Sequence, residues 1–205
     1  MFARSSTIQA RPELIDEGIA HVNEVMPTMQ AMDGYVGLSL LVDRATGRCI
    51  ATSAWQSEDA MHASAEGVRP VRDRAAEKFG ASGSTVEEWE IALLHRDHTS
   101  LEGACARCTW LQLEPSRADV GIDVFKNMLP QAEQLQGFCS ASLLVNRASG
   151  RGVATMTYDS LAALAGSRDR ASEVRTGGAQ QAGGEILEVS EFELAIAHLR
   201  VPELV

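Results

Sequence analysis

The stretch Gly34-Tyr35-Val36-Gly37-Leu38-Ser39-Leu40-Leu41-Val42-Asp43-Arg44-Ala45-Thr46-Gly47-Arg48 returns later as Gly137-Phe138-Cys139-Ser140-Ala141-Ser142-Leu143-Leu144-Val145-Asn146-Arg147-Ala148-Ser149-Gly150-Arg151. Every residue is displaced by 103 positions, without a gap. The same displacement pairs Arg4 with Arg107 and Pro27 with Pro130, and it still holds at His95 and His198. One register kept along the chain indicates a tandem duplication. We predict a first copy over 1–97, a polar linker over 98–103 and a second copy over 104–205.

Both copies show the same predicted order of elements, β-α-β-β-α-β, which is the split βαβ arrangement of ferredoxin-like folds. The expected strands are Ala3–Gln9, Tyr35–Val42, Arg48–Trp55 and Glu87–Leu94 in the first copy, and Ala106–Leu113, Phe138–Val145, Arg151–Tyr158 and Val189–Ala197 in the second. The loop Asp43–Gly47 has hairpin length, and its glycine can take a positive φ. Ser57 and Ser160 stand where the second helix needs an N-cap. The glycine-rich run from Thr176 to Gly184 predicts a flexible loop before the last strand.

The hairpin strands carry apolar or small residues on both faces, as in Leu38-Ser39-Leu40-Leu41-Val42. A sheet with one face in water would alternate apolar and polar residues, so both faces should be covered. Two helices can cover one face, and the sheet of the other copy is the obvious cover for the second. We therefore predict an α+β fold: two ferredoxin-like halves that form an intramolecular dimeric α+β barrel, with antiparallel sheets face to face.

Composition and charge exclude several classes of protein. The 205 residues are 45% hydrophobic and carry a net charge of -10, with lysines and arginines scattered singly. No basic stripe would neutralise phosphates, so we expect no nucleic-acid partner. The chain shows no secretory signal and no apolar run of membrane-spanning length. Four irregularly spaced cysteines do not form a disulfide framework. We expect a cytoplasmic protein without a membrane partner.

A strand that opens with Gly34-Tyr35-Val36-Gly37, a hairpin, and a strand that ends in Trp55-Gln56-Ser57 carry a family resemblance. With them the chain resembles the dimeric α+β barrel superfamily, in its antibiotic biosynthesis monooxygenase-like branch. The second copy keeps the pattern less fully, as Gly137-Phe138-Cys139-Ser140 and Tyr158-Asp159-Ser160. Members of this family are commonly homodimers, so the resemblance implies a dimer joined into one chain, either a monomeric pseudo-dimer or a dimer of pseudo-dimers.

The resemblance implies a cofactor-independent oxygenase that acts on a small aromatic or polyketide-like substrate. Such chemistry needs a base or hydrogen-bond donors in a dry cavity. The residues we expect to take part are Trp55, His62 and His21 in catalysis, and Arg72 and Tyr158 in substrate binding. The second copy has Val124 and Ala165 where the first has its histidines, so any active site should lie in the first copy. We expect no metal and no cofactor.

Two other functions stay open. The chain could be a non-catalytic ligand-binding or stress-associated module whose halves are filled by side chains. A cavity of a few hundred Å³ around Trp55, His62 and His21 would favour the enzyme instead. The haem-degrading members use an asparagine, a tryptophan and a histidine, and here Trp55 fills one of these positions while Thr7 falls near the first. A haem-binding or haem-degrading protein is therefore the least supported alternative.

Overall fold

The computed structural model describes residues 1–199 and 201–204, and it gives both copies the same order of elements. The first copy contains β1 (Phe2–Gln9), α1 (Ile15–Gln30), β2 (Tyr35–Val42), β3 (Arg48–Trp55), α2 (Glu58–Ala63), α3 (Ala65–Lys78) and β4 (Thr85–Arg96). The second copy contains β5 (Cys105–Gln112), α4 (Ala118–Ala132), β6 (Phe138–Asn146), β7 (Arg151–Tyr158), α5 (Leu161–Gly166), α6 (Arg168–Ala182) and β8 (Glu185–Leu199). The strands β2, β3 and β7 begin and end at the predicted residues.

The chain divides into two compact units. Unit 1 contains Met1–Trp89 and Leu194–Val201, and unit 2 contains Glu90–Glu193 and Pro202–Val205. The last strand of each copy, β4 or β8, therefore contributes its first residues to one unit and its last residues to the other.

Each unit has a central strand with an antiparallel neighbour on both sides. In unit 1, β3 pairs with β1 in a register that runs from Phe2 opposite Trp55 to Gln9 opposite Arg48, and β3 pairs with β2 on its other edge. In unit 2, β7 lies between β5 and β6, with β8 beside β5 and β4 beside β6. The predicted α+β class with two ferredoxin-like halves is confirmed.

The hairpin between β2 and β3 has the predicted turn. Gly47 has a φ of +79°, and a Cβ at this position would lie 2.3 Å from the backbone oxygen of Ala10. Asp43 accepts a hydrogen bond from the backbone N–H of Ala45, at 2.9 Å, which fixes the start of the turn. Only glycine satisfies both the positive φ and the close backbone approach.

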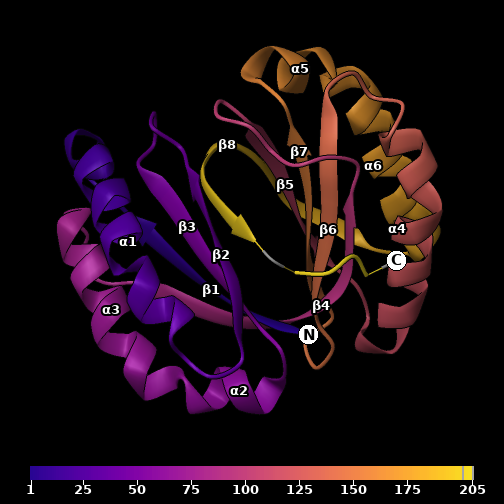
Figure 1. Cartoon of the computed structure of the whole chain (residues 1–205). Coiled ribbons are helices and arrows are strands. Elements are labelled where there is room, and N and C mark those ends of the chain that lie inside the picture. Colours follow the sequence, from indigo (N-terminus) through magenta and orange to yellow (C-terminus); the bar gives the residue numbers. More distant parts are fainter. Residues whose placement is uncertain (200, 205) are drawn as a thin grey trace. The chain divides into compact units, whose positions relative to one another are not determined.

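The two long helices of each unit cover one face of its sheet: α1 and α3 in unit 1, and α4 and α6 in unit 2 (Figure 1). The short helices α2 and α5 begin at the predicted N-caps. Ser57 Oγ accepts from the N–H of Ala60 at 3.1 Å, and Ser160 Oγ accepts from the N–H of Ala163 at 3.2 Å. No helix in the described part of the chain is both long enough and apolar enough to cross a membrane.

The prediction of a flexible loop from Thr176 to Gly184 is wrong. α6 continues through this run to Ala182 and ends at Gly183, which has a φ of +69°. Packing explains the glycine at position 178 of this helix, because a Cβ there would lie 2.3 Å from the sulfur of Met128 on α4. The glycine serves close packing of α6 on α4, which outweighs its low helix propensity.

Candidate functional site

Unit 1 holds a cavity of about 80 Å³ between its sheet and its two long helices, which we call the N-terminal cavity. The sheet side is formed by β1, β2 and β3, and the helix side by α1 and α3. Most lining residues are aliphatic, and the polar ones are Arg4, Ser6, Cys49, Ser53 and Arg72. Burial raises the pKa of the Cys49 thiol to about 11, so this group stays protonated at neutral pH. The described lining residues include no carboxylate and no histidine.

Unit 2 holds the matching C-terminal cavity, also about 80 Å³, between β5, β6, β7 and helices α4 and α6. Its arginines Arg107 and Arg175 are displaced by 103 positions from Arg4 and Arg72 of the first copy. Arg151 also lines this cavity. The duplication therefore repeats an apolar cavity and two of its arginines.

One arginine of each cavity lies on the helix side, and its guanidinium makes no hydrogen bond within the described part of the chain. Arg72 on α3 has a buried Nε without a hydrogen-bond partner, and Asp73 Oδ1 lies 3.5 Å away. Arg175 on α6 has no hydrogen-bond or ion-pair partner among the residues that the structure describes. Burial lowers the pKa of Arg175, and the positive charge of Arg107 lowers it further, against the opposite effects of Tyr158 and Glu191. We call Arg72 and Arg175 the cavity arginines.

The other arginine of each cavity lies on the first strand and is fully engaged. Arg4 is 4% exposed, and its Nε and Nη2 donate to Glu88 Oε1 at 3.0 and 2.8 Å. Its Nη2 also donates to the carbonyl of Met61 at 2.8 Å, which satisfies the end of α2. Arg107 repeats this arrangement with Glu191 and the carbonyl of Leu164. We call Arg4 and Arg107 the strand arginines.

Trp55 and Tyr158, predicted for catalysis and substrate binding, occupy equivalent places at the ends of β3 and β7. Both are completely buried, and neither lines the N-terminal or the C-terminal cavity. Trp55 Nε1 donates to Ser53 Oγ at 3.1 Å, and Ser53 does line the N-terminal cavity. The hydroxyl of Tyr158 accepts from Arg107 Nη1 at 3.4 Å, and the Arg107 guanidinium lies 5.5 Å from the Tyr158 ring centre. Each aromatic side chain therefore contacts a residue that lines a cavity without lining the cavity itself: Trp55 contacts Ser53, and Tyr158 contacts Arg107.

The structure does not bring the two predicted histidines together at the cavity. His62 is half exposed, and its Nε2 lies 3.1 Å from Glu88 Oε2. The other carboxylate oxygen of Glu88, Oε1, accepts from Arg4. His21 on α1 faces Glu24, with 3.3 Å between Nδ1 and Oε2. Neither histidine lines the N-terminal cavity. Of the five predicted residues, Arg72 alone lines one of the two cavities, and the roles of all five remain predictions.

The sequence analysis did not predict the strand arginines as site residues, although the sequence contains a signal for them. Arg4 and Arg107 recur at the same register position of a short strand, amid small and apolar residues. A charged side chain repeated within a strand that packs under helices indicates a buried, paired charge. The repeat was visible in the pairing of Arg4 with Arg107, but the partners Glu88 and Glu191 lie 84 residues further along the chain.

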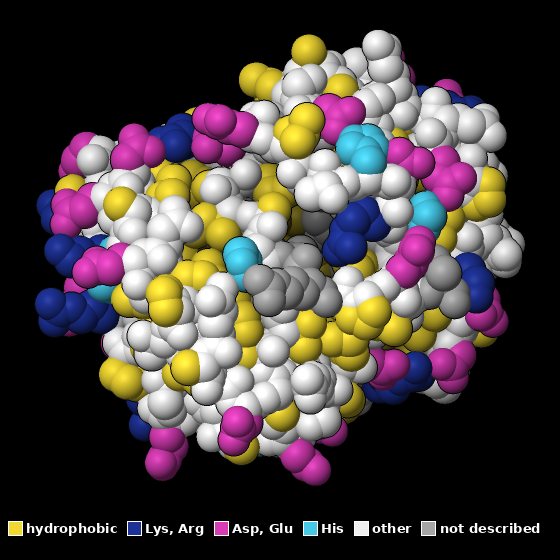
Figure 2. Space-filling model, viewed as in Figure 1, with side chains coloured by type: hydrophobic (Ala, Val, Ile, Leu, Met, Phe, Trp, Pro, Cys, Tyr) yellow, Lys and Arg dark blue, Asp and Glu magenta, His cyan; other side chains and the backbone are white. Residues whose placement is uncertain are grey.

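The face shown in Figure 2 carries charged side chains of both signs. Acidic and basic side chains are interspersed there, and neither sign gathers into one large patch. This distribution agrees with the scattered lysines and arginines of the sequence.

Comparison with known proteins agrees with this architecture. Residues 1–67 match the family model described as antibiotic biosynthesis monooxygenase. The uncharacterized protein Rv2557 of Mycobacterium tuberculosis (strain ATCC 25618 / H37Rv) is 58% identical over 207 aligned residues, which cover 100% of this chain and 92% of the relative.

Two solved structures share the fold at low identity. An anthrone oxidase-like protein is 14% identical with a TM-score of 0.70, and the alignment covers 100% of this chain and 94% of the other. A putative monooxygenase from Lactobacillus acidophilus NCFM is 10% identical with a TM-score of 0.68, over 94% of this chain and 92% of the other. The chain therefore contains an antibiotic biosynthesis monooxygenase domain in its first copy, and because it is 58% identical to Rv2557 along its whole length it belongs to the same family as that protein.

Proposed function

We propose that this protein binds small, mainly apolar molecules that carry one acidic oxygen, and that the cavity arginines hold that oxygen. The observation that carries the proposal is the unsatisfied Nε of Arg72 in the wall of an apolar cavity. The repetition of this arginine as Arg175 in the second cavity supports it.

Electrostatics favours an anionic ligand oxygen. Arg72 is partly buried, its Nε makes no hydrogen bond, and its ion-pair contact with Asp73 is long at 3.5 Å. A carboxylate, phenolate or enolate oxygen of a ligand would supply the missing charge-assisted hydrogen bond. In the C-terminal cavity the lowered pKa of Arg175 has burial as its first cause and the charge of Arg107 as its second. A ligand anion beside Arg175 would act against both, because it would replace lost hydration and offset the like charge.

The size of the cavities limits the ligand. A typical small-molecule site encloses roughly 300–1,000 Å³, whereas each cavity here measures about 80 Å³. We therefore expect a ligand with a single aromatic ring or of similar size. A fused-ring molecule would require the helices to move away from the sheet.

A second function is oxygenation without a cofactor. The N-terminal cavity is smaller than the few hundred Å³ expected of the enzyme and is not lined by Trp55, His62 or His21, but Arg72 places a cation in its apolar wall. The described lining residues of the N-terminal cavity offer no group that could accept a proton at neutral pH. The guanidinium would instead lower the pKa of a bound phenol or enol so that the substrate ionises by itself. The anion would donate an electron to dioxygen, and a CH2 group would become C=O as the second oxygen atom leaves as water. The substrate supplies all the electrons, so no cofactor is consumed.

In this proposal the predicted catalytic residues become positioning residues. Trp55 would fix the Ser53 hydroxyl at the cavity wall, and His62 would act on Arg4 through Glu88. The described cavity walls contain no histidine that could ligate a haem iron, so the cavities do not support the haem alternative.

The experiment compares wild type with Arg72→Met, Arg175→Met and the double variant, using Arg74→Met on the exposed side of α3 as the matched control. Calorimetric titration uses salicylate as the anionic probe and anisole as the neutral one. We expect each single variant to lose one class of salicylate site, the double variant to weaken binding at least tenfold, and anisole binding to change little. Equal salicylate affinity in wild type and the double variant would refute the proposal.

Oxygen uptake with a panel of single-ring phenols and single-ring enolisable ketones that carry an activated CH2 group then separates the two functions. Uptake by wild type that falls in the double variant and persists in Arg74→Met supports the oxygenase. Salicylate binding without uptake on any substrate supports the ligand-binding module.

A further inference from the structure

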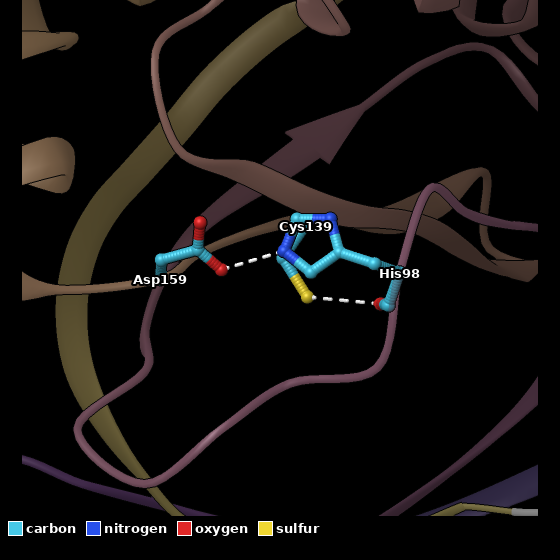
Figure 3. A group of neighbouring side chains, drawn as sticks. All are labelled: His98, Cys139 and Asp159. Carbon is cyan, nitrogen blue, oxygen red and sulfur yellow. Dashed lines mark hydrogen bonds and ion pairs between the residues drawn. The ribbon is translucent and has the colours of Figure 1, made fainter.

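A histidine, a cysteine and an aspartate meet in unit 2, away from both cavities (Figure 3). One ligand atom from each of His98, Cys139 and Asp159 lies within 4.8 Å of the others. His98 Nε2 lies 2.6 Å from Asp159 Oδ1, and Cys139 Sγ donates to the carbonyl of His98 at 3.3 Å. The cysteine is fully buried, while the histidine and aspartate side chains are 40% and 42% exposed. We call this group the His98 cluster.

The backbone builds the cluster from three separate segments. The pairing of β6 with β7 shifts between Phe138 and Ser140, so Cys139 is the extra residue of a β-bulge. Bulges redirect a side chain and leave the backbone of the extra residue free for other partners. The carbonyl of Cys139 accepts from the N–H groups of Asp97 and His98, at 2.9 and 3.4 Å. The linker is thereby fixed against the bulge and places His98 over the cysteine.

The second nitrogen of His98 is also held. Its Nδ1 lies 2.7 Å from Asp97 Oδ2, while Nε2 faces Asp159. A carboxylate on one ring nitrogen sets the tautomer and orientation of a histidine whose other nitrogen binds a metal. Asp97 therefore stands where a metal-binding histidine has its supporting carboxylate.

We propose that the His98 cluster binds one Zn²⁺ ion through His98 Nε2, Cys139 Sγ and Asp159 Oδ1. Imidazole, thiolate and carboxylate together match the preference of zinc, and three protein ligands leave the fourth tetrahedral position for water. Tetrahedral coordination requires about 3.3 Å between the histidine nitrogen and the carboxylate oxygen. The present 2.6 Å contact must therefore open by less than about 1 Å, which two half-exposed side chains can provide. The ion would replace the proton shared between them.

Unit 1 provides an internal comparison. The positions displaced by 103 residues are Val36, Gln56 and Val201. Val36 is again the extra residue of a bulge, between Tyr35 and Gly37. The scaffold is thus repeated without its ligands, so the proposal predicts one zinc ion per chain. It also identifies substitutions that the fold accepts at two of the positions, valine for Cys139 and glutamine for Asp159.

The test uses untagged, full-length protein dialysed against a chelator and titrated with Co²⁺ alone, followed by displacement with Zn²⁺. We expect one equivalent of Co²⁺, with the intense visible bands of tetrahedral coordination and a near-ultraviolet band from thiolate ligation. Cys139→Val should abolish the thiolate band, and Asp159→Gln and His98→Gln should each weaken binding at least tenfold. Asp97→Asn should weaken it about tenfold through loss of histidine orientation. Cys108→Ala in the same unit is the matched control and should bind like wild type.

Three results would overturn the proposal. The first is wild type that takes up less than half an equivalent of Co²⁺ at micromolar concentration. The second is a thiolate band that survives Cys139→Val. The third is a Co²⁺ affinity that is unchanged in Asp159→Gln and His98→Gln. Both positions are half-exposed, and circular dichroism checks that the two variants fold. None of these results depends on ligand binding in the cavities.

Discussion

Glu191→Gln tests the charge network around Arg107, a buried residue that lines the C-terminal cavity. Glu191 accepts from Arg107 at 3.0 and 2.8 Å and from Arg168 at 3.1 and 2.6 Å, and Arg107 is 4% exposed. Removing one partner of a fully buried ion pair costs about 3–5 kcal/mol. Glu191 is 26% exposed, and Arg107 keeps the carbonyl of Leu164, so we expect a loss of about 2–3 kcal/mol in the free energy of unfolding. Urea unfolding followed by circular dichroism at pH 7 measures it.

The pH dependence of this loss has a definite sign. Hydrogen bonds from Arg168, followed by those from Arg107, lower the pKa of Glu191 in the folded protein despite its partial burial. A lowered carboxyl pKa contributes stability that is fully present above the unfolded pKa of about 4.3 and is lost as pH falls through the folded value. The difference between wild type and Glu191→Gln should therefore stay constant from about pH 6 to 8 and shrink below about pH 4.

Glu88→Gln is the matched control, because Glu88 holds the same position in the first copy with a more exposed side chain. At 40% exposure and with Arg4 and His62 as partners, we expect a loss of about 1 kcal/mol or less. A loss below about 0.5 kcal/mol in Glu191→Gln, or a larger loss in Glu88→Gln, would refute the assignment of a buried pair to Arg107.

Two further predictions concern local geometry. Gly150→Ala should lower the free energy of unfolding by about 2 kcal/mol or more, because Gly150 has a φ of +73° and a Cβ would lie 2.0 Å from the backbone oxygen of Leu113. Thermal unfolding measures this, and Gly166→Ala, which meets nothing within 4 Å, should be neutral or slightly stabilising. Ser160→Ala removes the N-cap of α5 and should cost about 1 kcal/mol, and an unchanged unfolding temperature would show that the cap contributes nothing.

The scaffold could be predicted because its signals are local and repeated. The hairpin needs only Asp43 and Gly47, and the second helix needs only its serine N-cap; both signals recur 103 residues later. The glycine run from Thr176 was misread because single-residue propensity says nothing about a neighbouring helix. The glycine at position 178 is accounted for by the close approach of Met128, which belongs to another element and leaves no room for a Cβ.

The candidate sites depended on contacts that no local pattern contains. Trp55 carries part of the family resemblance and His62 was predicted beside it for catalysis, yet neither lines the N-terminal cavity. Trp55 contacts the lining residue Ser53, and His62 contacts Glu88, which pairs with the lining residue Arg4. His98 lies in a segment that was predicted as a linker, and its role follows from a bulge at Cys139. Sequence reasoning could identify Arg72, because its repetition as Arg175 is visible in the chain.

The central claim is that the cavity arginines hold an acidic oxygen, and the ionisation of bound 4-nitrophenol tests it most directly. Phenolate absorbs visible light and phenol does not, so an absorbance titration gives the pKa of the bound probe. We predict that wild type lowers this pKa by at least about 1 unit relative to free 4-nitrophenol, and that Arg72→Met with Arg175→Met abolishes the decrease. A bound probe whose pKa is unchanged or raised in wild type would contradict the account, because it would show a cavity that excludes water without stabilising an anion.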